Sequence, residues 1–363
     1  MIRTAFRSVK LLLTILLSLL TVVSYYQSYF PVSQTDLLSF TGFAFPYLWT
    51  LTLVVFIILL VSKSRISSVC SFIALAATFC GIVDIVHIVA YPSKSDNSIK
   101  ILTFNIADFK SGGDGREMTI EGIRQLLEDE DADIVCLQEV CAGQWQDVLN
   151  KGSLGKMLGY RYFLYDRAEG AKKNRGRVAQ AILSRYPIVD DEEIVFNRKV
   201  KSRMMAAKVT VRGETLRVVN CHLESNALSQ DEIRAVSDAQ HVDIDNKTED
   251  NLKTTYEKLR RAQAAREEQV TFLADLIDKM SGPTVVCGDF NDIPTSNTYH
   301  RLTARYHDTF ESATFTLGDT YNGSLPPIRI DYILHSDEFV TCDYYIIDKN
   351  LSDHFPVVAK VAL

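Results

Sequence analysis

The sequence lacks the close-spaced cysteine patterns that build zinc sites and small disulfide scaffolds. Its 363 residues contain seven cysteines, an odd number. Three of them, Cys136, Cys221 and Cys287, lie inside apolar runs, where cysteine behaves as a small core residue. A domain held together by disulfides is therefore not expected, although a single bridge stays open as an alternative.

Positive charge is also scarce over most of the chain. Residues 1–96 contain six of the 39 Lys and Arg and three of the 45 Asp and Glu, so the remainder carries a formal net charge of −9. A protein that grips long nucleic acid non-specifically usually has a basic surface, because neutralising phosphates supplies the affinity. The balance argues against a duplex substrate unless the fold forms a local basic cleft.

Charge is nearly absent from three long stretches near the N-terminus. Each is 19 to 23 residues long, and a helix needs about 20 apolar residues to cross roughly 30 Å of hydrocarbon. A cleavable signal peptide is the alternative for the first stretch, because Arg3, Arg7 and Lys10 precede it, but no small-residue cleavage site follows. We expect three transmembrane helices, at about residues 11–30, 43–61 and 69–91.

The charges that flank these stretches predict their orientation. Basic residues precede the first stretch, and Lys63 and Arg65 lie between the second and the third, whereas the loop 31–42 carries only Asp36. Loops rich in Lys and Arg stay in the cytoplasm. The N-terminus is therefore expected in the cytoplasm and the chain after residue 91 outside it. Short loops and the absence of a processed signal favour a bacterial inner membrane.

The chain thus divides into a membrane region, residues 1–95, and a second domain, residues 96–363. In the second domain, strand-like runs alternate with amphipathic helical patterns, without internal repeats or low-complexity segments. This alternation favours one α/β domain with buried sheets. Strands are predicted at about residues 98–109, 131–140, 160–166, 178–189, 192–197, 204–211, 215–224, 282–292, 328–336 and 355–363, and helices at about 118–130 and 250–280.

Polar side chains interrupt or end many of these apolar strands. Because alternate residues of a strand point the same way, Asn220 and His222 project together, as do Asp289 and Asn291. Each group alone has an ordinary explanation, such as an Asx-turn, a solvated strand end or a satisfied core histidine. Their recurrence at six strand ends favours a functional site on a rigid scaffold. The remaining groups are Asn105, Gln138, Glu139, Asp331, Asp353 and His354.

Together these stretches resemble the endonuclease/exonuclease/phosphatase superfamily, which includes deoxyribonuclease I, abasic-site endonucleases, neutral sphingomyelinases and inositol polyphosphate 5-phosphatases. The resemblance runs from Thr103 to Val357 and leaves out the membrane region. It implies a four-layer α/β sandwich, with two mixed sheets packed face to face between helices and a site where the strand ends of both sheets meet. The matching stretches are "TFNI", "LQEV", "LSRYPI", "NCHLES", "GDFND", "RIDYIL" and "SDHFPV".

The resemblance also implies a metal site. Glu139 would be the principal ligand, with Asn105 and Asp353 nearby and Gln138 in a supporting position. Carboxylate and amide oxygens suit Mg²⁺, with Mn²⁺ as an alternative. Such a cation neutralises the charge that develops when a phosphoester is hydrolysed.

The other polar residues are implied to act on water and phosphate. Asp289 would orient or deprotonate the attacking water, and Asn291 would donate to the phosphate. His222 and His354 would contact the phosphate, and Asp331 would hold the imidazole of His354. Arg185, in "LSRYPI", is a further candidate phosphate contact, with a solvated strand end as its equal alternative. Which residue is the base and which the acid stays open.

The expected activity is metal-dependent hydrolysis of a phosphodiester at a membrane, with a phospholipid or sphingolipid head group as the favoured substrate. A tethered nuclease acting on external nucleic acid is the alternative. A phosphomonoesterase and a non-catalytic binding module are weaker alternatives. The loops 172–177 and 225–249 are expected to distinguish lipid from nucleic acid. The lipid bilayer and the phosphoester are the expected partners, and no protein partner is inferred.

Overall fold

The computed structural model describes residues 2–87, 95, 97–107, 120–141, 154–165, 178–194, 203–226, 232, 246–312, 316–323 and 327–363. The chain forms two compact units. A helical unit comprises residues 1–86 together with 292–301, and an α/β unit comprises residues 87–291 and 302–363. The predicted boundary at residues 95 and 96 adjoins 88–94, outside the described residues, and stays a prediction.

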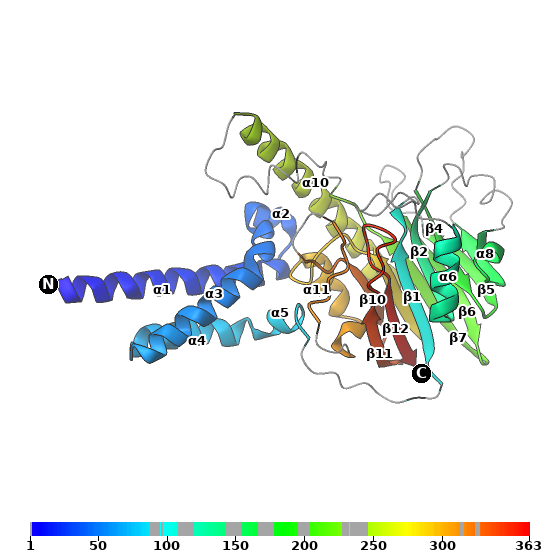
Figure 1. The fold of residues 1–363 in the computed structure, drawn as a ribbon, viewed down its shortest axis with the longest axis horizontal. Helices are drawn as coiled ribbons and strands as arrows, with labels where there is room; N and C mark the ends of the chain where they lie inside the picture. Colours follow the sequence, from blue (N-terminus) through cyan, green and yellow to red (C-terminus); the bar gives the residue numbers. More distant parts are fainter. Residues whose placement is uncertain are drawn as a thin grey trace. The chain divides into compact units, whose positions relative to one another are not determined.

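The α/β unit contains two six-stranded sheets, each of mixed direction (Figure 1). The order of the first sheet is β11-β12-β1-β2-β4-β3. Only its β1–β2 pair is parallel, and the other pairs are antiparallel. Its strands are β1 (Ile99–Asn105), β2 (Ile134–Cys141), β3 (Tyr162–Tyr165), β4 (Val178–Ser184), β11 (Val340–Ile346) and β12 (Val357–Ala362).

The second sheet repeats this plan. Its order is β5-β6-β7-β8-β10-β9, and its only parallel pair is the central β7–β8. Each sheet therefore has one adjacent pair of strands whose carboxyl ends lie side by side. The strands are β5 (Ile188–Ile194), β6 (Arg203–Val211), β7 (Glu214–His222), β8 (Thr284–Asp289), β9 (His307–Asp308) and β10 (Asp331–His335).

Two hydrophobic clusters form the layers. One fills the space between the sheets, with Ile101 and Ile182 of the first sheet packed against Val218 and Val285 of the second. The other packs the opposite face of the first sheet against helix α6 (Ile120–Glu130), through Leu126 and its neighbours. This arrangement confirms the predicted four-layer sandwich. The free cysteines Cys136, Cys221 and Cys287 are buried, as predicted for core residues.

Helix α10 (Asn246–Ile277) confirms the predicted long helix between β7 and β8. Its Val270, Leu273, Ala274 and Ile277 are buried and recur at helical spacing. Shorter elements complete the described chain: α8 (Leu154–Met157), α11 (Asn297–Thr303) and the 3₁₀ turn η4 (Thr309–Ser312). The short strands β9 and β11 were missed in the sequence, because neither is a clean apolar run.

In the helical unit, two of the described helices are long and apolar enough to cross a membrane, at Ala5–Tyr29 and Leu38–Val61. Membrane spans, signal sequences and buried core helices share such composition. The unit comprises α1 (Ile2–Tyr26), α2 (Val32–Thr35), α3 (Thr41–Val61), α4 (Arg65–Ala77), α5 (Phe79–Val83) and the 3₁₀ turns η1 (Gln27–Tyr29) and η2 (Asp36–Phe40).

The third predicted transmembrane helix is wrong. The stretch 69–91 is broken at Thr78, which separates α4 from α5, and neither helix reaches the length of a span. The Thr78 hydroxyl donates to the carbonyl of Ala74 at 2.8 Å, a local bond of the kind that bends or ends helices. Composition alone does not reveal this break, because Thr78 lies among apolar residues.

The helices pack through small hydroxyl side chains. Thr21 of α1 and Thr52 of α3 are both buried, and their hydroxyls lie 2.7 Å apart. Ser67 and Ser71 of α4 are also buried. Leu12, Leu16 and many other large apolar side chains are exposed instead. Small residues inside and large apolar residues outside are typical of helices that associate in lipid.

Candidate functional site

The two parallel strand pairs place polar residues at matching ends. In the first sheet, Asn105 at the end of β1 is paired with Gln138 of β2. In the second, His222 at the end of β7 is paired with Asp289 at the end of β8. Ion pairs and hydrogen bonds join the two sets, and Asn105 Nδ2 donates to Asp289 Oδ2 at 2.9 Å. The site therefore forms where the strand ends of both sheets meet, as predicted.

Unusual backbone conformations mark this edge. The register of β2 against β4 shifts between Leu137 and Val140, and Glu139 within this bulge has φ +53°. Asn291, two residues after β8, has φ +52°. Positive φ is disfavoured for residues with a side chain, and bulges re-aim side chains. The fold accepts local strain at two of the predicted site residues.

Gly288, just before Asp289, allows β7 and β8 to approach closely. Its φ is +135°, and a Cβ atom there would overlap the carbonyl oxygen of Cys221. Only glycine adopts this conformation without strain. The first residue of "GDFND" therefore brings Asp289 beside His222.

Asp289 is the centre of the described site. Its side chain is 1% exposed and accepts hydrogen bonds from Asn105 Nδ2 and from the backbone N–H of Asn291 at 2.8 Å. The Asn291 side-chain amide also donates to Asp289, at 3.2 Å, and to the carbonyl of Leu223, at 3.1 Å. Donors on several sides fix the carboxylate in one orientation.

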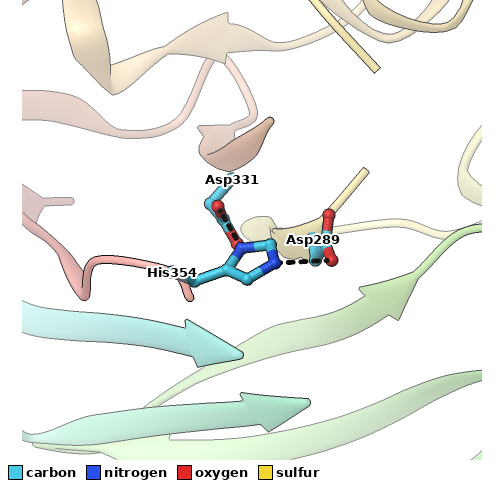
Figure 2. Close-up of side chains that lie close together, drawn as sticks. All are labelled: Asp289, Asp331 and His354. Carbon is cyan, nitrogen blue, oxygen red and sulfur yellow. Dashed lines mark hydrogen bonds and ion pairs between the residues drawn. The ribbon is translucent and has the colours of Figure 1, made fainter. Parts of the chain in front are cut away.

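A histidine lies between two buried carboxylates, as Figure 2 shows. His354 Nδ1 is 2.9 Å from Asp331 Oδ2, and its Nε2 is 3.8 Å from Asp289 Oδ2. Burial alone would lower the pKa of His354, but Asp331 and Asp289 outweigh it and raise the pKa to about 10. Burial raises the pKa of Asp331, while the His354 charge opposes that rise. The imidazole is therefore held as a proton donor aimed at Asp289.

His222 lies between two further carboxylates. Its Nε2 is 3.6 Å from Glu139 Oε1 and 3.7 Å from Asp289 Oδ2, and this buried atom has no hydrogen-bond partner among the described residues. A buried nitrogen without a partner is costly. Its position suits a ligand oxygen placed between the carboxylates.

Asp353 adjoins the same cluster. Its carboxylate accepts a hydrogen bond from Ser352 Oγ, which also donates to the carbonyl of Asn105 at 2.9 Å. Burial raises the pKa of Tyr321, and the negative charge of Asp353 adds to that rise; the same charge adds to the larger effects of Asp331 and Asp289 on the pKa of His354. The structure thus brings together eight predicted residues: Asn105, Glu139, His222, Asp289, Asn291, Asp331, Asp353 and His354.

The segment around Tyr321 is a part of the site that sequence reasoning missed. The Tyr321 ring lies edge-on to the imidazole of His354, with ring centroids 5.5 Å apart. Thr320 Oγ1 accepts the N–H of Asp331, and the Asn322 N–H donates to the carbonyl of Asp353 at 2.7 Å. This segment joins the Asp331 and His354 strand ends. The Tyr321 segment has no apolar run, so the sequence offers only one signal for it, an aromatic residue beside an Asn-Gly turn.

Gln138 and Asn220 are buried between the sheets, below the site, and support it. Gln138 Nε2 donates to Asn220 Oδ1 at 2.8 Å and to Thr103 Oγ1 at 2.9 Å. Asn220 Nδ2 donates to the carbonyls of Leu137 and Ala181, both at 3.0 Å. These buried amides join the two sheets directly below the polar strand ends.

Arg185 is not part of this cluster, and its predicted contact with phosphate stays a prediction. It follows Ser184, which is paired with Ile134 at the start of β2, whereas Glu139 lies near the other end of that strand. Its guanidinium forms a 2.5 Å ion pair with Asp131. Because β4 runs antiparallel to β2, the motif "LSRYPI" ends at the wrong edge of the sheet. Of the loops 172–177 and 225–249, expected to distinguish lipid from nucleic acid, residues 172–177, 227–231 and 233–245 lie outside the described residues.

The donor set fits a hard divalent cation. Glu139 has a partly exposed carboxylate that accepts no hydrogen bond from the described residues. Asn105 and Asp353 add an amide oxygen and a second carboxylate, which are the ligand types that Mg²⁺ prefers. Asp289, Asp331 and His354 also lie within 4.8 Å of one another. Among these three residues, both imidazole nitrogens of His354 face carboxylates. A protonated imidazole fits this arrangement better than a metal ion does.

The comparison with protein families agrees with this geometry. A model of the Endonuclease/Exonuclease/phosphatase family matches residues 102–354. The protein therefore belongs to this family, whose members are hydrolases of phosphoester bonds, and the resemblance of the motifs is confirmed. Residues 6–83 match a domain of unknown function, DUF8431. No curated protein matches the chain.

Solved structures share the fold at low identity. An endonuclease/exonuclease/phosphatase from Beutenbergia cavernae is 18% identical, with a TM-score of 0.50, and the match covers 74% of this chain and 72% of that one. D. rerio TDP2 complexed with a single-strand DNA product is 17% identical, also at 0.50, covering 74% and 100%. A functionally unknown protein from Enterococcus faecalis is 18% identical at 0.50, covering 73% and 99%. These likenesses establish the sandwich fold alone.

Proposed function

We propose that the protein is a membrane-anchored, divalent-metal-dependent phosphodiesterase. The observation that carries this proposal is the arrangement around Asp289. This buried carboxylate is fixed by two asparagines and faces the imidazole of a His354–Asp331 pair and the unpartnered nitrogen of His222. A base, a proton donor and a phosphate contact in one place match what phosphoester hydrolysis needs.

Each side chain has a role in this proposal. Asp289 orients the attacking water and accepts its proton, and Asn291 holds that carboxylate and donates to the phosphate. His354, held by Asp331, donates to a phosphoryl oxygen, as does His222. Mg²⁺, or Mn²⁺ in its place, would be held by Glu139 with Asn105 and Asp353, and would neutralise phosphate charge.

A phospholipid or sphingolipid head group is the proposed substrate. Two apolar helices with exposed leucines precede the α/β unit, and the chain re-enters the helical unit at Asp292, directly after Asn291. Thr295 lies six positions after Asp289, and a fully extended chain of that length spans at most about 22 Å. The proposed base is therefore followed, within a few positions of chain, by a segment that belongs to the helical unit. We place the N-terminus in the cytoplasm of a bacterial cell and the α/β unit outside it.

A tethered nuclease is the second candidate. The observation that favours it is the fold shared with D. rerio TDP2, whose structure contains a single-strand DNA product. The formal net charge of −9 after residue 96 opposes it, because phosphate binding is electrostatic.

The metal-dependent part of the proposal is tested with full-length protein in nanodiscs and bis(4-nitrophenyl) phosphate. Hydrolysis is expected with Mg²⁺ and is lost with excess chelator. Glu139→Gln is expected to raise the Mg²⁺ concentration needed for half-maximal rate by at least tenfold, while the exposed control Glu257→Gln leaves it unchanged. Hydrolysis that persists in chelator, or an unchanged Mg²⁺ requirement in Glu139→Gln, contradicts the proposed metal role.

A further inference from the structure

The segment that continues the "GDFND" motif is bound by the N-terminal helices. Residues 292–301 belong to the helical unit, although they are separated from its other residues by about 200 positions of chain. Gln27 Nε2 donates to the carbonyl of Thr295 at 3.1 Å, and Thr295 Oγ1 donates to the carbonyl of Gly42 at 3.0 Å. These two bonds join the segment to the end of α1 and the start of α3.

A third side chain strengthens this attachment from the segment itself. Asn297 Nδ2 donates to the carbonyls of Ser28 and Phe30, at 3.0 and 3.1 Å. Those carbonyls lie beyond the end of α1, where helical partners are missing. The asparagine therefore caps a helix end that would otherwise need water.

Aromatic packing holds the far end of the segment. The ring of His300 stacks on Tyr29 with centroids 4.3 Å apart and lies edge-on to Tyr25 at 5.7 Å. Tyr25 packs in turn on Phe45 of α3, at 5.3 Å. Both helices thus contribute to the surface under the segment.

Gly42 shows how closely α3 approaches. A Cβ atom at this position would lie 2.7 Å from the carbonyl oxygen of Thr295 and 2.9 Å from Gln27 Nε2. Such distances force a displacement, and the carbonyl is backbone. Glycine at the start of α3 is therefore required by the bound segment.

We propose that the helical unit is a positioning element for the active site, acting through residues 292–297 on Asn291. Asn291 adjoins this segment and has a strained backbone, and its N–H donates to Asp289. Strained conformations persist only when the surroundings over-determine them. With the next residues fixed on the helices, Asn291 is held in the conformation that orients the proposed base. The catalytic part of this inference rests on the proposed function.

Thr295 provides the sharpest variants. Thr295→Val keeps the shape of the side chain and removes the hydroxyl that donates to Gly42, whereas Thr295→Ser keeps the hydroxyl. Thr50→Val is the matched control, because the Thr50 hydroxyl in α3 donates to the carbonyl of Pro46 within the same helix. Gly42→Ala tests the close approach independently.

The first readout is amide hydrogen exchange of the full-length protein in nanodiscs, which needs no activity. One lost hydrogen bond is worth roughly a tenfold change in a local opening equilibrium. Backbone amides of residues 291–293 and 295–298 are expected to exchange about tenfold faster in Thr295→Val and Gly42→Ala, and at the wild-type rate in Thr295→Ser and Thr50→Val. Wild-type exchange at Asn291 in Thr295→Val and Gly42→Ala overturns the proposal.

The second readout is steady-state hydrolysis of bis(4-nitrophenyl) phosphate. A positioning role predicts a kcat about tenfold lower in Thr295→Val with little change in KM, and recovery in Thr295→Ser. Faster exchange at Asn291 with an unchanged kcat contradicts positioning of the base. A wild-type protein without hydrolytic activity would refute the proposed function instead, and the exchange of Asn291 would still decide whether the helices hold this residue.

Discussion

Both units bury polar side chains, but they satisfy them over very different distances along the chain. In α1, the hydroxyls of Thr14, Thr21 and Ser24 donate to carbonyls three or four residues earlier in the same helix. In the sandwich, Gln138 bonds to Asn220, 82 residues away, and Asn105 bonds to Asp289, 184 residues away. Local bonds allow helices to pack in an apolar solvent, whereas long-range bonds fix one tertiary arrangement. In the helical unit, Thr21 also reaches Thr52 of a neighbouring helix, and Gln27, Thr295 and Asn297 join segments that are far apart in the sequence.

The largest expected effect comes from the most connected polar group of the sandwich. Asp289→Asn removes the proposed base and keeps the shape of the side chain, so kcat is expected to fall by roughly 10³-fold. The free energy of unfolding should fall by about 1–3 kcal/mol, because the new amide nitrogen faces a donor that the carboxylate accepted. Steady-state hydrolysis and thermal unfolding measure the two quantities. The exposed control Asp190→Asn should change neither, and an active Asp289→Asn variant would exclude this residue as the base.

The second effect concerns the proton on His354. Asp331→Asn is expected to lower kcat by about 100-fold and to lower the pKa of His354, because the nearest negative charge is lost. In the wild type the imidazolium persists until the pH nears about 10. The alkaline decline of the pH–rate profile should therefore begin at lower pH in the variant. A decline at the same pH as the wild type would show that His354 is not the proton donor. Asp343→Asn, at a surface ion pair, is the control.

The third effect compares the buried polar groups of the two units directly. Asn220→Ala removes the buried amide that accepts a hydrogen bond from Gln138 and donates to the carbonyls of Leu137 and Ala181, and it is expected to lower the free energy of unfolding by about 3 kcal/mol. Thr21→Val loses the contact with Thr52, which is worth less than about 1 kcal/mol if the helices pack in lipid. Unfolding in nanodiscs, followed separately for each unit, tests this. If both variants lose the same free energy of unfolding, local and long-range hydrogen bonds of buried side chains do not differ in the way proposed here.

The smallest effect is a pH dependence inside the helical unit. Burial lowers the pKa of His300 to about 4, from an ordinary value of 6.5. The unfolded chain therefore binds a proton at a higher pH than the folded chain does. The stabilisation by neutral His300 is present above pH 6.5 and is lost as the pH falls towards 4.

Melting temperatures at pH 6.5 and pH 5 measure this loss, which is about 1 kcal/mol after discounting for partial exposure. His300→Phe keeps an aromatic ring against Tyr29 and should show a smaller decline. His307→Phe alters an exposed histidine of the other unit and should decline as the wild type does. A wild-type decline in His300→Phe as well would contradict burial of a neutral imidazole.

The sandwich and most of the candidate site could be predicted because the candidate residues lie at the ends of strands. The end of an apolar strand can be recognised in a sequence. Asn105 and Asp289 each close an apolar run, and the parallel pairing of β1 with β2 and of β7 with β8 brings them together. The position of Arg185 was not predictable in this way, because motif membership does not state which end of a strand a residue occupies. The antiparallel direction of β4 decides that.

Other features could not be predicted from the sequence. The Tyr321 segment contributes backbone bonds and one ring, and it carries no periodic pattern. The break at Thr78 depends on a hydroxyl that bonds within its own helix, and the apolar composition of the stretch does not reveal such a bond. Residues 292–301 are attached to the helices by contacts such as the bond between Gln27 and Thr295, which are 268 positions apart in the sequence. The local sequence around either residue does not indicate this bond.

The central claim is that this site hydrolyses a membrane phosphodiester, and its most direct test is a substrate panel. Full-length protein and Asp289→Asn, both in detergent, are incubated with Mg²⁺ or excess chelator on sphingomyelin and phospholipid micelles and on single- and double-stranded DNA. The account predicts chelator-sensitive release of phosphorylated head group by the wild type alone, with intact DNA. Cleaved DNA beside intact lipid would identify a tethered nuclease, and no cleavage of any phosphodiester would contradict the account.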